Sequence, residues 1–340
     1  MRILIIMDPS IIIPVSGYGG IERIIELLAK EYLKLGHEVH LLVTKGSNVK
    51  GCYMHSLGDA GFPPKKYNSL LAIPKAWHFV FNNRIKFDLI HNFGRLLYLL
   101  PVINKNVKKI MSYQREITKK NIEVWEKLPS KNMFFTGCSF DLVNRNFLPG
   151  NWSAIHNCCD FNLYTLQSQV LNNAPLIFLG RIERVKGCHT AIAVAKATNN
   201  KLIIAGNISQ LIEEQNYYEK EIMPHIDGEQ IIYIGQVNDT QKNEWLGKSK
   251  ALLMPIEWNE PFGIVMIEAM ACGTPVIAFN MGSVNEVIDE NITGFKVSNI
   301  EEMQNAINKI HLIDRDACRK KSSENFDVAI IAKKYLALFN

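Results

Sequence analysis

The chain has 340 residues, of which 47% are hydrophobic and 21% charged; this length allows two domains, and the composition is typical of a folded soluble protein rather than a disordered one. No apolar run reaches the roughly 18–20 residues that a membrane span needs, and the apolar start meets Asp8 too early for a signal peptide. The seven cysteines are odd in number and form no Cys-x-x-Cys pair, which argues against a disulfide framework or a structural zinc site and predicts a cytoplasmic location.

The formal net charge of +5 is divided unevenly along the chain. Residues 1–155 hold 21 Lys and Arg against 11 Asp and Glu, a net +10, whereas residues 156–340 hold 17 against 22, a net −5. Basic residues are densest over 105–131. A basic half is typical of proteins that meet nucleic acid, anionic lipid or a phosphorylated acceptor, and equally of a solvated face that only maintains solubility.

Short apolar strands alternate with helices through the first half of the chain. Residues 2–7 form an apolar run that ends at Asp8, as a buried parallel strand does. Residues 21–36 then place apolar side chains at helical spacing and stop at Gly36, a usual helix end. The alternation predicts a doubly wound α/β domain over residues 1–157. Further strands are expected at 37–44, 87–94, 108–114, 132–139 and 152–157.

The turn between the first strand and the first helix, residues 16–23, is rich in glycine. Gly17, Gly19 and Gly20 let the backbone approach a ligand closely, and the helix start behind them offers free N–H groups suited to phosphate. A dinucleotide fingerprint would need a third glycine where Glu22 stands, and a turn directly after the strand. These two departures argue against a dehydrogenase. A merely flexible loop is the alternative.

The alternation of strand and helix restarts in the second half. A segment without periodicity, residues 158–174, predicts a linker. Residues 175–313 then form a second, similar domain, and residues 314–340 are helical and long enough to cross back to the first domain. Within the second domain, five short apolar strands are expected at 175–180, 201–206, 230–235, 251–256 and 275–280.

The loop at residues 180–187, GRIERVKG, follows the first strand of the second domain. Ligands of open α/β sheets bind beyond the carboxyl ends of the strands, so such loops are the expected binding elements. Arg181 can form paired hydrogen bonds to phosphate oxygens, and Lys186 supplies a compact positive charge. Two bases in a loop are more often only solvated. Here both stand at a strand end in the acidic half of the chain, which favours a phosphate site.

Two glutamates bracket seven uncharged residues in 260–268, EPFGIVMIE. Pro261 suits the first turn of a helix, which places Glu260 at or before the N-cap and Glu268 about two turns further on. An unpaired charge in an apolar helix is costly, whereas an ionised carboxylate accepts hydrogen bonds from neighbouring hydroxyls. The pair predicts a site for a hydroxyl-rich ligand, with Gly263 keeping the backbone open. A capping glutamate plus an exposed helical one is the alternative.

These motifs together resemble the retaining family 4 glycosyltransferases of the GT-B fold. The segments GRIERVKG at 180–187, EWNEPFGIVMIEAMACGTPVIAFNMGSVNEVI at 257–288 and NITGFKV at 291–297 resemble the family's C-terminal domain, and SGYGGIER at 16–23 extends the resemblance over nearly the whole chain. The resemblance implies two Rossmann-like, doubly wound domains facing a central cleft. The first would bind the acceptor and the second the nucleotide-sugar.

The resemblance also implies roles for individual residues. Arg181 and Lys186 would bind the donor diphosphate and stabilise its charge as it leaves, and together with Glu260 they are the expected catalytic residues. Glu260 would contact hydroxyls of the donor sugar, and Glu268 would hold the ribose. The other donor-lining positions would be Gly19 and Gly20, closing on the diphosphate from the first domain, and the backbone of Phe262, Gly263, Ile264 and Val265.

One histidine of the resembled family is missing. Many of its members carry a histidine after the fifth strand of the first domain, where this chain has Gln114 and Arg115. His91, one strand earlier, is a candidate for the cleft, although a lone histidine near a strand end is more often a satisfied polar group. Gly235 and Gln236, at another strand end, are candidates to neighbour the nucleotide base.

The expected activity is transfer of a hexose from a nucleotide-sugar to a sugar or glycolipid acceptor, with retention, in lipopolysaccharide, polysaccharide or glycolipid synthesis. No cofactor and no metal are expected, because no DxD-like motif is evident, and nucleic acid is not an expected partner. A GT-B phosphorylase or epimerase-like enzyme and a basic nucleic-acid-binding protein are the alternatives. Residues 67–86 mix aromatic, apolar and basic side chains, which suits peripheral contact with an anionic membrane at its inner face, or core packing.

Overall fold

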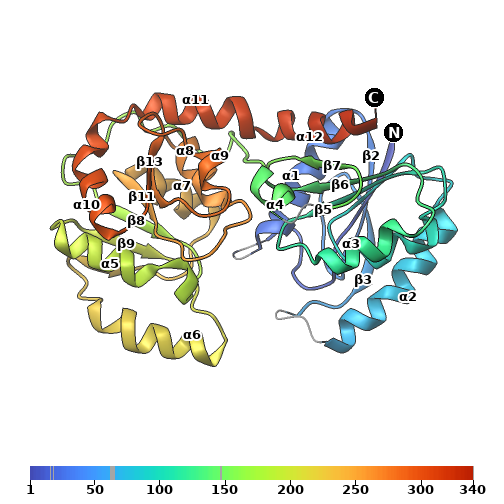
Figure 1. The fold of residues 1–340 in the computed structure, drawn as a ribbon, viewed down its shortest axis with the longest axis horizontal. Helices are drawn as coiled ribbons and strands as arrows, with labels where there is room; N and C mark the ends of the chain where they lie inside the picture. Colours follow the sequence, from blue (N-terminus) through green and yellow to red (C-terminus); the bar gives the residue numbers. More distant parts are fainter. Residues whose placement is uncertain (16, 18, 62–65, 146–147, 340) are drawn as a thin grey trace. The chain divides into compact units, whose positions relative to one another are not determined.

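The structure is a computed structural model that describes residues 1–15, 17, 19–61, 66–145 and 148–339, without the side chains of 66–70. The chain divides into two compact units. Unit 1 comprises Met1–Cys158 together with Val328–Asn340, and unit 2 comprises Cys159–Asp327. In Figure 1, unit 1 is coloured from blue to green and includes the red C-terminal end, whereas unit 2 is coloured from green through yellow and orange to red.

Unit 1 is built on a parallel sheet of seven strands in the order β3-β2-β1-β4-β5-β6-β7. The order runs in opposite directions on the two sides of β1, which confirms the predicted doubly wound topology. Strand β3 was not predicted from the sequence, because its residues, YMHSLG, are half polar. The strands are β1 (Arg2–Ile6), β2 (Glu38–Thr44), β3 (Tyr53–Gly58), β4 (Leu89–Asn92), β5 (Lys108–Tyr113), β6 (Met133–Gly137) and β7 (Trp152–Ala154). The helices are α1 (Gly20–Lys34), α2 (Lys66–Asn83), α3 (Lys119–Glu126), α4 (Phe140–Asn144), α12 (Val328–Leu336) and the short η1 (Leu96–Val102) and η6 (Ala337–Phe339).

Unit 2 repeats this plan with a parallel sheet of six strands in the order β10-β9-β8-β11-β12-β13. Five of the strands were predicted, and β13 joins them at the edge beside β12. The strands are β8 (Leu176–Leu179), β9 (Leu202–Ala205), β10 (Ile231–Tyr233), β11 (Ala251–Met254), β12 (Val276–Phe279) and β13 (Gly294–Val297). The helices are α5 (Cys188–Ala197), α6 (Ile212–Tyr217), α7 (Asp239–Lys248), α8 (Ile264–Ala271), α9 (Val284–Val287), α10 (Ile300–Lys309) and α11 (Arg315–Phe326), with short turns η2 (Arg184–Lys186), η3 (Tyr218–Ile222), η4 (Met223–His225) and η5 (Ile310–Leu312).

The central strands of both sheets are apolar because helices cover both of their faces. In unit 2, β9 (LIIA) and β11 (ALLM) are buried at every position. Each fully buried Leu or Ile side chain contributes about 1.5–3 kcal/mol through the hydrophobic effect. The sheets are therefore stable platforms, and the loops at their carboxyl edges are free to carry polar residues.

The predicted linker at 158–174 is wrong, because residues from Cys159 onward belong to unit 2. Two arginines of α11 hold this segment in place. The guanidinium of Arg315, which is 7% exposed, donates to the carbonyls of Gln167 at 2.5 Å and Ser249 at 3.0 Å. Arg319 donates to the carbonyl of Tyr164 at 2.6 Å. Bonds between such distant parts of the sequence leave no local periodic signal.

The helical stretch predicted at 314–340 consists of two helices that belong to different units. Helix α11 is part of unit 2, and α12 is part of unit 1. Between them Asp327 has φ −61° and ψ 138°, an extended conformation that ends α11. Helix α12 packs against α1 and buries Ile331 and Tyr335. The C-terminal helix is thus an integral element of the first unit.

The structure places His91 inside the core of unit 1, which corrects its prediction as a cleft residue. His91 lies on β4 and has no exposed surface. Its Nε2 lies 2.7 Å from Oγ of Ser112, and its Nδ1 lies 3.5 Å from the hydroxyl of Tyr32. Burial lowers the pKa of His91 to about 3. His91 is therefore a neutral, hydrogen-bonded core residue.

This buried imidazole is expected to make the protein less stable in acid. The unfolded chain binds a proton on His91 near its ordinary pKa of about 6.5, whereas the folded chain does so only near pH 3. As the pH falls through this window, the free energy of unfolding should decrease by about 1.4 kcal/mol per pH unit from this residue. Urea unfolding of the wild type and His91→Gln between about pH 7 and pH 5 measures the effect. If His91→Gln loses as much unfolding free energy between these pH values as the wild type does, the assignment of His91 as a neutral core residue is wrong.

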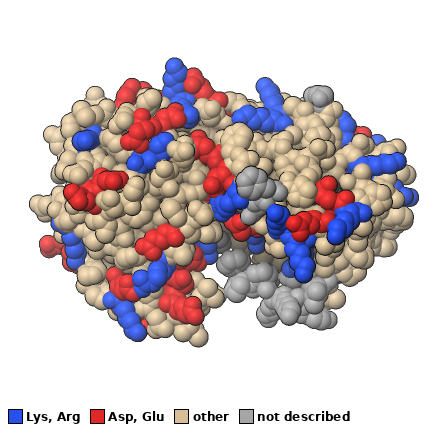
Figure 2. Space-filling view, viewed as in Figure 1, with Lys and Arg blue, Asp and Glu red and all other residues tan. Residues whose placement is uncertain are grey.

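Two further properties concern membrane-spanning helices and the distribution of surface charge. Within the described ranges, no helix is both long enough and apolar enough to cross a bilayer. On the face drawn in Figure 2, basic and acidic side chains lie interspersed over both units. The excess of basic residues in the first half of the sequence is therefore mixed with acidic groups on that face.

Candidate active site

Two loops and one helix meet at the carboxyl edge of the unit 2 sheet. The loop after β8 carries Arg181 and Lys186, the loop after β11 carries Glu260, and helix α8 carries Glu268. Strands β8, β11 and β12 are neighbours in the sheet. The carboxyl ends of neighbouring parallel strands lie at one edge, which is where ligands of such sheets bind. The sheet order thus brings the loops of both predicted motifs to the same edge.

Lys186 and Glu260 form an ion pair at this edge. The Nζ atom of Lys186 lies 2.5 Å from Oε2 of Glu260, which is itself only 9% exposed. The indole N–H of Trp258 donates to the same oxygen at 2.9 Å, and the Trp258 ring centre lies 4.8 Å from the Lys186 ammonium. The second oxygen, Oε1, accepts no hydrogen bond from any residue that the structure describes. That oxygen can accept a hydrogen bond from a ligand hydroxyl.

Backbone hydrogen bonds hold the loops of the site together. The N–H of Ser283, in the loop after β12, donates to the carbonyl of Glu260 at 3.0 Å, and its hydroxyl donates to the carbonyl of Phe262 at 2.8 Å. The N–H of Glu257 donates to the carbonyl of Val185 at 2.8 Å. Three loops are thereby fixed to one another, so the charged pair is preorganised.

Gly187 makes the close approach of two of these loops possible. Its φ of 74° is in the left-handed region, and a Cβ at this position would lie 1.9 Å from the carbonyl oxygen of Pro255. No side chain fits between the two loops. The glycine that ends the GRIERVKG motif is therefore needed to bring Lys186 to Glu260.

Arg181 is the second cation of the site. Its guanidinium lies 2.5 Å from Oε1 of Glu183, and 28% of its side chain is exposed. Burial raises the pKa of Glu183, and the positive charge of Arg181 opposes this shift. The pair orients the guanidinium while leaving part of it accessible, as a phosphate-binding arginine requires.

The helix that follows Glu260 begins later than predicted. Helix α8 has Gly263 as its N-cap, with φ 72° and ψ 67°, so Pro261 lies in the loop and not in the first helical turn. This left-handed residue interrupts any helical geometry between Glu260 and Glu268. The N-cap supplies no side-chain hydrogen bond, which leaves the first-turn N–H groups around Ile264 and Val265 suited to an anion.

Three further predicted donor contacts are Phe262, Gly235 and Gln236. The Phe262 side chain is buried against Phe326 at 5.8 Å between ring centres, so only its backbone faces the loop. Gly235 and Gln236 follow β10. The carbonyl of Gly235 accepts the N–H of Gly206 at 2.8 Å, and Gln236 is exposed. They stand at the same edge of the sheet, two strands from β8.

Glu268 is buried and paired. Its Oε1 accepts from the ammonium of Lys242 at 2.5 Å and from the hydroxyl of Tyr164 at 2.7 Å, and 6% of its side chain is exposed. Burial, followed by the negative charge of Glu268, raises the pKa of Tyr164. Lys242 also lies 3.5 Å from Asp239. Oε2 of Glu268 accepts no hydrogen bond within the described part of the chain, so it can accept one from a ligand.

The predicted site residues of unit 1 lie at the carboxyl edge of its own sheet. Gly19 is the N-cap of α1, with φ 150°, and Gly20 is the first residue of that helix. Gln114 and Arg115 follow β5. The Gln114 Nε2 atom is buried and finds no hydrogen-bond partner in the described structure, and Arg115 is exposed. Ser16 and Tyr18 of the glycine-rich turn lie outside the described residues.

Sequence reasoning missed four side chains that shape the site. Trp258 and Glu183 lie inside the quoted motifs, next to the residues that they orient, so a closer reading of those motifs could have included them. Lys242 lies on α7 and Tyr164 in the segment read as a linker. Nothing in the local sequence connects these two residues to Glu268.

The described residues contain no group of three His, Cys, Asp or Glu side chains that could hold a metal ion. The positive charges of the site are instead those of Arg181 and Lys186. Both are able to form charge-assisted hydrogen bonds with phosphate oxygens.

Comparison with known proteins shows which family part of the chain resembles. Residues 168–326 match the family model described as Glycosyl transferases group 1. Phosphatidyl-myo-inositol mannosyltransferase of Propionibacterium freudenreichii is 32% identical over 118 residues, which are 33% of this chain and 31% of that protein. The chain spans less than half the length of the first curated relatives that it matches.

Solved structures share the fold over the whole chain. Sucrose-phosphate synthase of Thermosynechococcus elongatus has a TM-score of 0.79 at 20% identity, covering 99% of this chain and 98% of that one. Anabaena HepE in complex with UDP-glucose has a TM-score of 0.74 at 17% identity, covering 100% of this chain and 99% of that one. With two Rossmann-like units and these structural neighbours, the chain has the GT-B fold, and its residues 168–326 resemble the glycosyl transferases group 1 family.

Proposed function

We propose that the chain is a retaining hexosyltransferase of family 4 that moves a sugar from a nucleotide-sugar to an acceptor hydroxyl. The observation that carries the proposal is the ion pair of Lys186 with Glu260, on the same sheet edge as Arg181 and the N-terminus of α8. A nucleotide-sugar presents a diphosphate next to sugar hydroxyls, which are the groups that these cations and this carboxylate recognise. The mannosyltransferase relative and the UDP-glucose complex of HepE support a donor of this class.

The cations would act when the donor diphosphate leaves. Negative charge builds on the diphosphate as its bond to the sugar breaks, and Arg181, Lys186 and the first-turn N–H groups of α8 would stabilise that charge. Because these groups are already held in place, they need no reorganisation during the reaction, and such preorganised electrostatic stabilisation is usually the largest catalytic term.

The Lys186–Glu260 pair would exchange partners when the donor binds. In the structure the ammonium of Lys186 is bonded to the Glu260 carboxylate. A diphosphate competes for that ammonium, and the carboxylate then turns to the sugar hydroxyls while Trp258 keeps it oriented. Glu268, held by Lys242 and Tyr164, would accept from the ribose hydroxyls through Oε2.

No protein nucleophile is assigned. In the proposed step the bond between the anomeric carbon and the diphosphate oxygen breaks, and a bond from the same carbon to the acceptor oxygen forms on the same face. The acceptor proton passes to an oxygen of the departing phosphate. Glu260 acts in binding, because its carboxylate is proposed to accept hydrogen bonds from the sugar hydroxyls once Lys186 has turned to the diphosphate.

Four other predicted positions keep the roles that the family resemblance implies. Gly19 and Gly20 stay predicted contacts of the diphosphate, and Gly235 and Gln236 stay predicted neighbours of the base. Neither a cofactor nor a metal ion is part of the proposal, because the two site cations take the part that a metal would play.

The donor is tested by thermal unfolding with UDP, GDP, ADP and their sugar conjugates, with a chelator present. A ligand at 100 times its dissociation constant adds about 2.7 kcal/mol to the unfolding free energy, so a selective rise in melting temperature would name the base. Product analysis of the matching nucleotide-sugar with an acceptor would then establish transfer and its stereochemistry. If no nucleotide stabilises the protein and inorganic phosphate with a glycan supports turnover, the proposal fails in favour of a phosphorylase.

The acceptor is proposed to be a sugar or glycolipid presented at an anionic membrane, as in lipopolysaccharide or polysaccharide synthesis. Helix α2 and the turn after it expose Leu71, Phe81 and Ile85, which are 42%, 42% and 86% exposed. No acidic residue occurs between Asp59 and Asp88, whereas five basic residues do. Exposed apolar side chains flanked only by positive charge suit the surface of an anionic bilayer.

Liposome sedimentation tests this contact. We expect the protein to bind vesicles with anionic lipid at low salt and to bind neutral vesicles weakly, because each basic residue near an anionic surface contributes about 1 kcal/mol. The double variant Phe81→Ser, Ile85→Ser should lose most of this binding. Val124→Ser, which removes a side chain that is 56% exposed on α3, is the matched control. Equal binding by both variants would remove α2 as the membrane contact.

A further inference from the structure

A cluster of polar side chains occupies one face of the unit 1 sheet at the amino ends of its strands. Arg2 on β1, Glu38 and His40 on β2, and His55 on β3 all lie on the face that α2 covers, since Arg2 pairs with Glu38 and Leu42 pairs with His55 in register. Parallel strands covered by helices are normally apolar on both faces. The candidate active site lies in the other unit and uses none of these residues.

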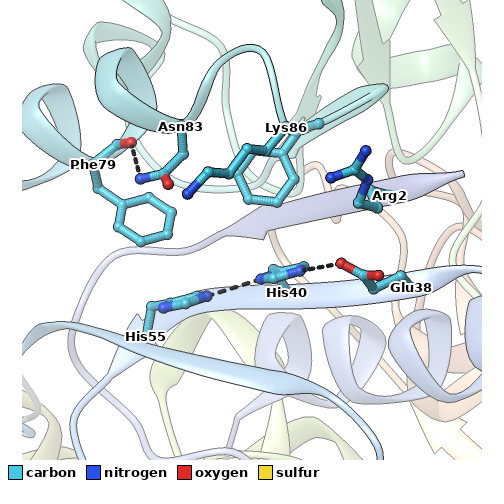
Figure 3. A pocket seen from close by; sticks show the side chains of 8 residues that line it. Arg2, Glu38, His40, His55, Phe79, Asn83 and Lys86 are labelled. Carbon is cyan, nitrogen blue, oxygen red and sulfur yellow. Dashed lines mark hydrogen bonds and ion pairs between the residues drawn. The ribbon is translucent and has the colours of Figure 1, made fainter.

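The polar side chains line a cavity of about 140 Å³. Figure 3 shows Glu38, His40 and His55 in a row on β2 and β3, with Arg2 on the neighbouring strand β1 and with Asn83 and Lys86 on the side of α2. The remaining wall is aromatic, formed by Phe79 and Phe87. A space of this size holds a few water molecules or one small ion, and is too small for a nucleotide.

The hydrogen bonds along the row fix its protonation pattern. Nε2 of His40 lies 2.8 Å from Oε1 of Glu38, and Nδ1 of His40 lies 2.9 Å from Nε2 of His55. A carboxylate only accepts, so His40 donates from Nε2, and its Nδ1 then accepts the N–H of His55. With both imidazoles neutral, every hydrogen bond in the row is made. The remaining basic nitrogen is Nδ1 of His55.

Two cations at the cavity have no carboxylate partner. Among the residues that the structure describes, neither Arg2 nor Lys86 forms an ion pair, although the backbone N–H of Arg2 donates to Asp88 at 2.6 Å. The charges that face the cavity are therefore Arg2 from β1, Lys86 from the turn after α2, and the single negative charge of Glu38 from β2, which His40 already engages. A proton on the histidine pair would raise the net charge of the cavity from +1 to +2.

A metal ion fits this arrangement poorly. The two imidazole nitrogens that would have to face a metal are joined directly to each other, and Arg2 and Lys86 would repel a cation. An anion instead gains from both cations and from a protonated histidine pair.

We propose that this cavity is a binding site for a phosphate-sized dianion, held by Arg2 and Lys86 and completed by one proton taken up on the His40–His55 pair. Arginine and lysine supply the charge-assisted hydrogen bonds that phosphate oxygens accept. The ligand class is a phosphate group, either free in solution or on the headgroup of an acidic lipid. This proposal does not depend on the proposed transferase activity, so the failure of one would not contradict the other.

Binding of the dianion is linked to pH. Burial and then the neighbouring His40 lower the pKa of His55, so the protonated form of His55 is disfavoured. A bound dianion favours the proton, which raises the pKa again. By linkage, affinity increases as the pH falls from about 7.5 to about 6. Sulfate is the decisive probe, because its own charge does not change over this range.

The test measures sulfate and phosphate binding by calorimetry and by the imidazole NMR signals of His40 and His55. Both anions should bind saturably, shift these signals, and bind more tightly at the lower pH. Arg2→Gln and Lys86→Gln should each weaken binding about tenfold or more, the loss expected for one charge-assisted hydrogen bond. Arg84→Gln is the matched control, because Arg84 lies two residues from Lys86 but stacks on Phe81 outside the cavity. It should leave binding unchanged.

A soluble short-chain phosphatidic acid forms the second arm and distinguishes the two sources. If inorganic phosphate binds, or if only the lipid phosphate binds, with the same dependence on Arg2 and Lys86, the proposal holds and the source is identified. If no anion shifts the histidine signals, if the control variant loses as much affinity as Lys86→Gln, or if zinc alone shifts them, the proposal is overturned.

Discussion

Arg181→Ala is expected to lower the turnover of the proposed glycosyl transfer by about two to three orders of magnitude, the usual effect of removing one preorganised group that stabilises developing charge. The arginine acts mainly when the diphosphate leaves, so kcat should fall more than donor affinity. The melting temperature should change little, because 28% of the side chain is exposed and Glu183 keeps a hydrogen bond from Ser209. Steady-state kinetics with the donor found by thermal unfolding measures the effect.

Arg184→Ala is the matched control for this variant. Arg184 lies three positions further along the same loop, but its guanidinium is paired with Glu221 and stacks on the Tyr217 ring at 4.7 Å. Its loss should change turnover by no more than a few-fold. Arg181→Lys should recover part of the activity, because it restores the charge without the paired hydrogen-bond geometry. Near-normal turnover of Arg181→Ala, or an equal loss in Arg184→Ala, would rule out the assigned role.

Lys242→Met is expected to destabilise unit 2 by about 3–5 kcal/mol, the usual result of leaving a buried charge without its partner. The Glu268 carboxylate, with 6% of its side chain exposed, would keep only the hydroxyl of Tyr164 as a donor. Glu268→Gln should also destabilise the protein, although Asp239 lies 3.5 Å from Lys242 and offsets part of the loss. Urea unfolding of the three proteins measures these differences.

The double variant Lys242→Met, Glu268→Gln separates stability from binding. It contains no uncompensated buried charge, so most of the lost stability should return, and the two single effects should be strongly non-additive. Nucleotide binding should be weakened in Glu268→Gln and in the double variant alike, because a Gln side chain cannot replace the carboxylate that is proposed to accept the ribose hydroxyls. A double variant that binds nucleotide like the wild type would refute the ribose contact.

Lys248→Met is the matched control on the same helix. Lys248 pairs with Glu244 at 2.5 Å, as closely as Lys242 pairs with Glu268, but the two side chains are 61% and 53% exposed. Exposed pairs contribute about 0–1 kcal/mol. A similar loss of stability in both lysine variants would show that burial is not what makes the Lys242 pair important.

Local sequence patterns were sufficient for the parts of this protein that depend on neighbours in the chain. Strands β9 and β11 are buried at every position and β1 at every position after Arg2, so these stretches are continuous apolar runs. The motifs at 180–187 and 257–268 lie within single loops at strand ends, and strand order then brings both to one edge. Fold class and the main candidate residues could therefore be predicted.

Other features were decided only by the tertiary structure, because they depend on residues far apart in the sequence. Arg315 draws the segment read as a linker into unit 2, and Tyr164 from that same segment reaches Glu268. The polar face around His40 includes residues of β3. The mixed polar and apolar sequence of β3 shows no strand periodicity, so this strand was not predicted.

The sequence by itself determined the two doubly wound domains and the presence of a basic loop and two glutamates near strand ends, since both follow from hydrophobic periodicity and residue type. The tertiary structure alone decided which of these charges are paired. It joined Lys186 to Glu260, buried Glu268 against Lys242, and placed His91 in the core rather than in a cleft. The reason is physical: partners and burial are set by packing across the sheet, and a linear pattern carries no record of which side chains that packing brings together.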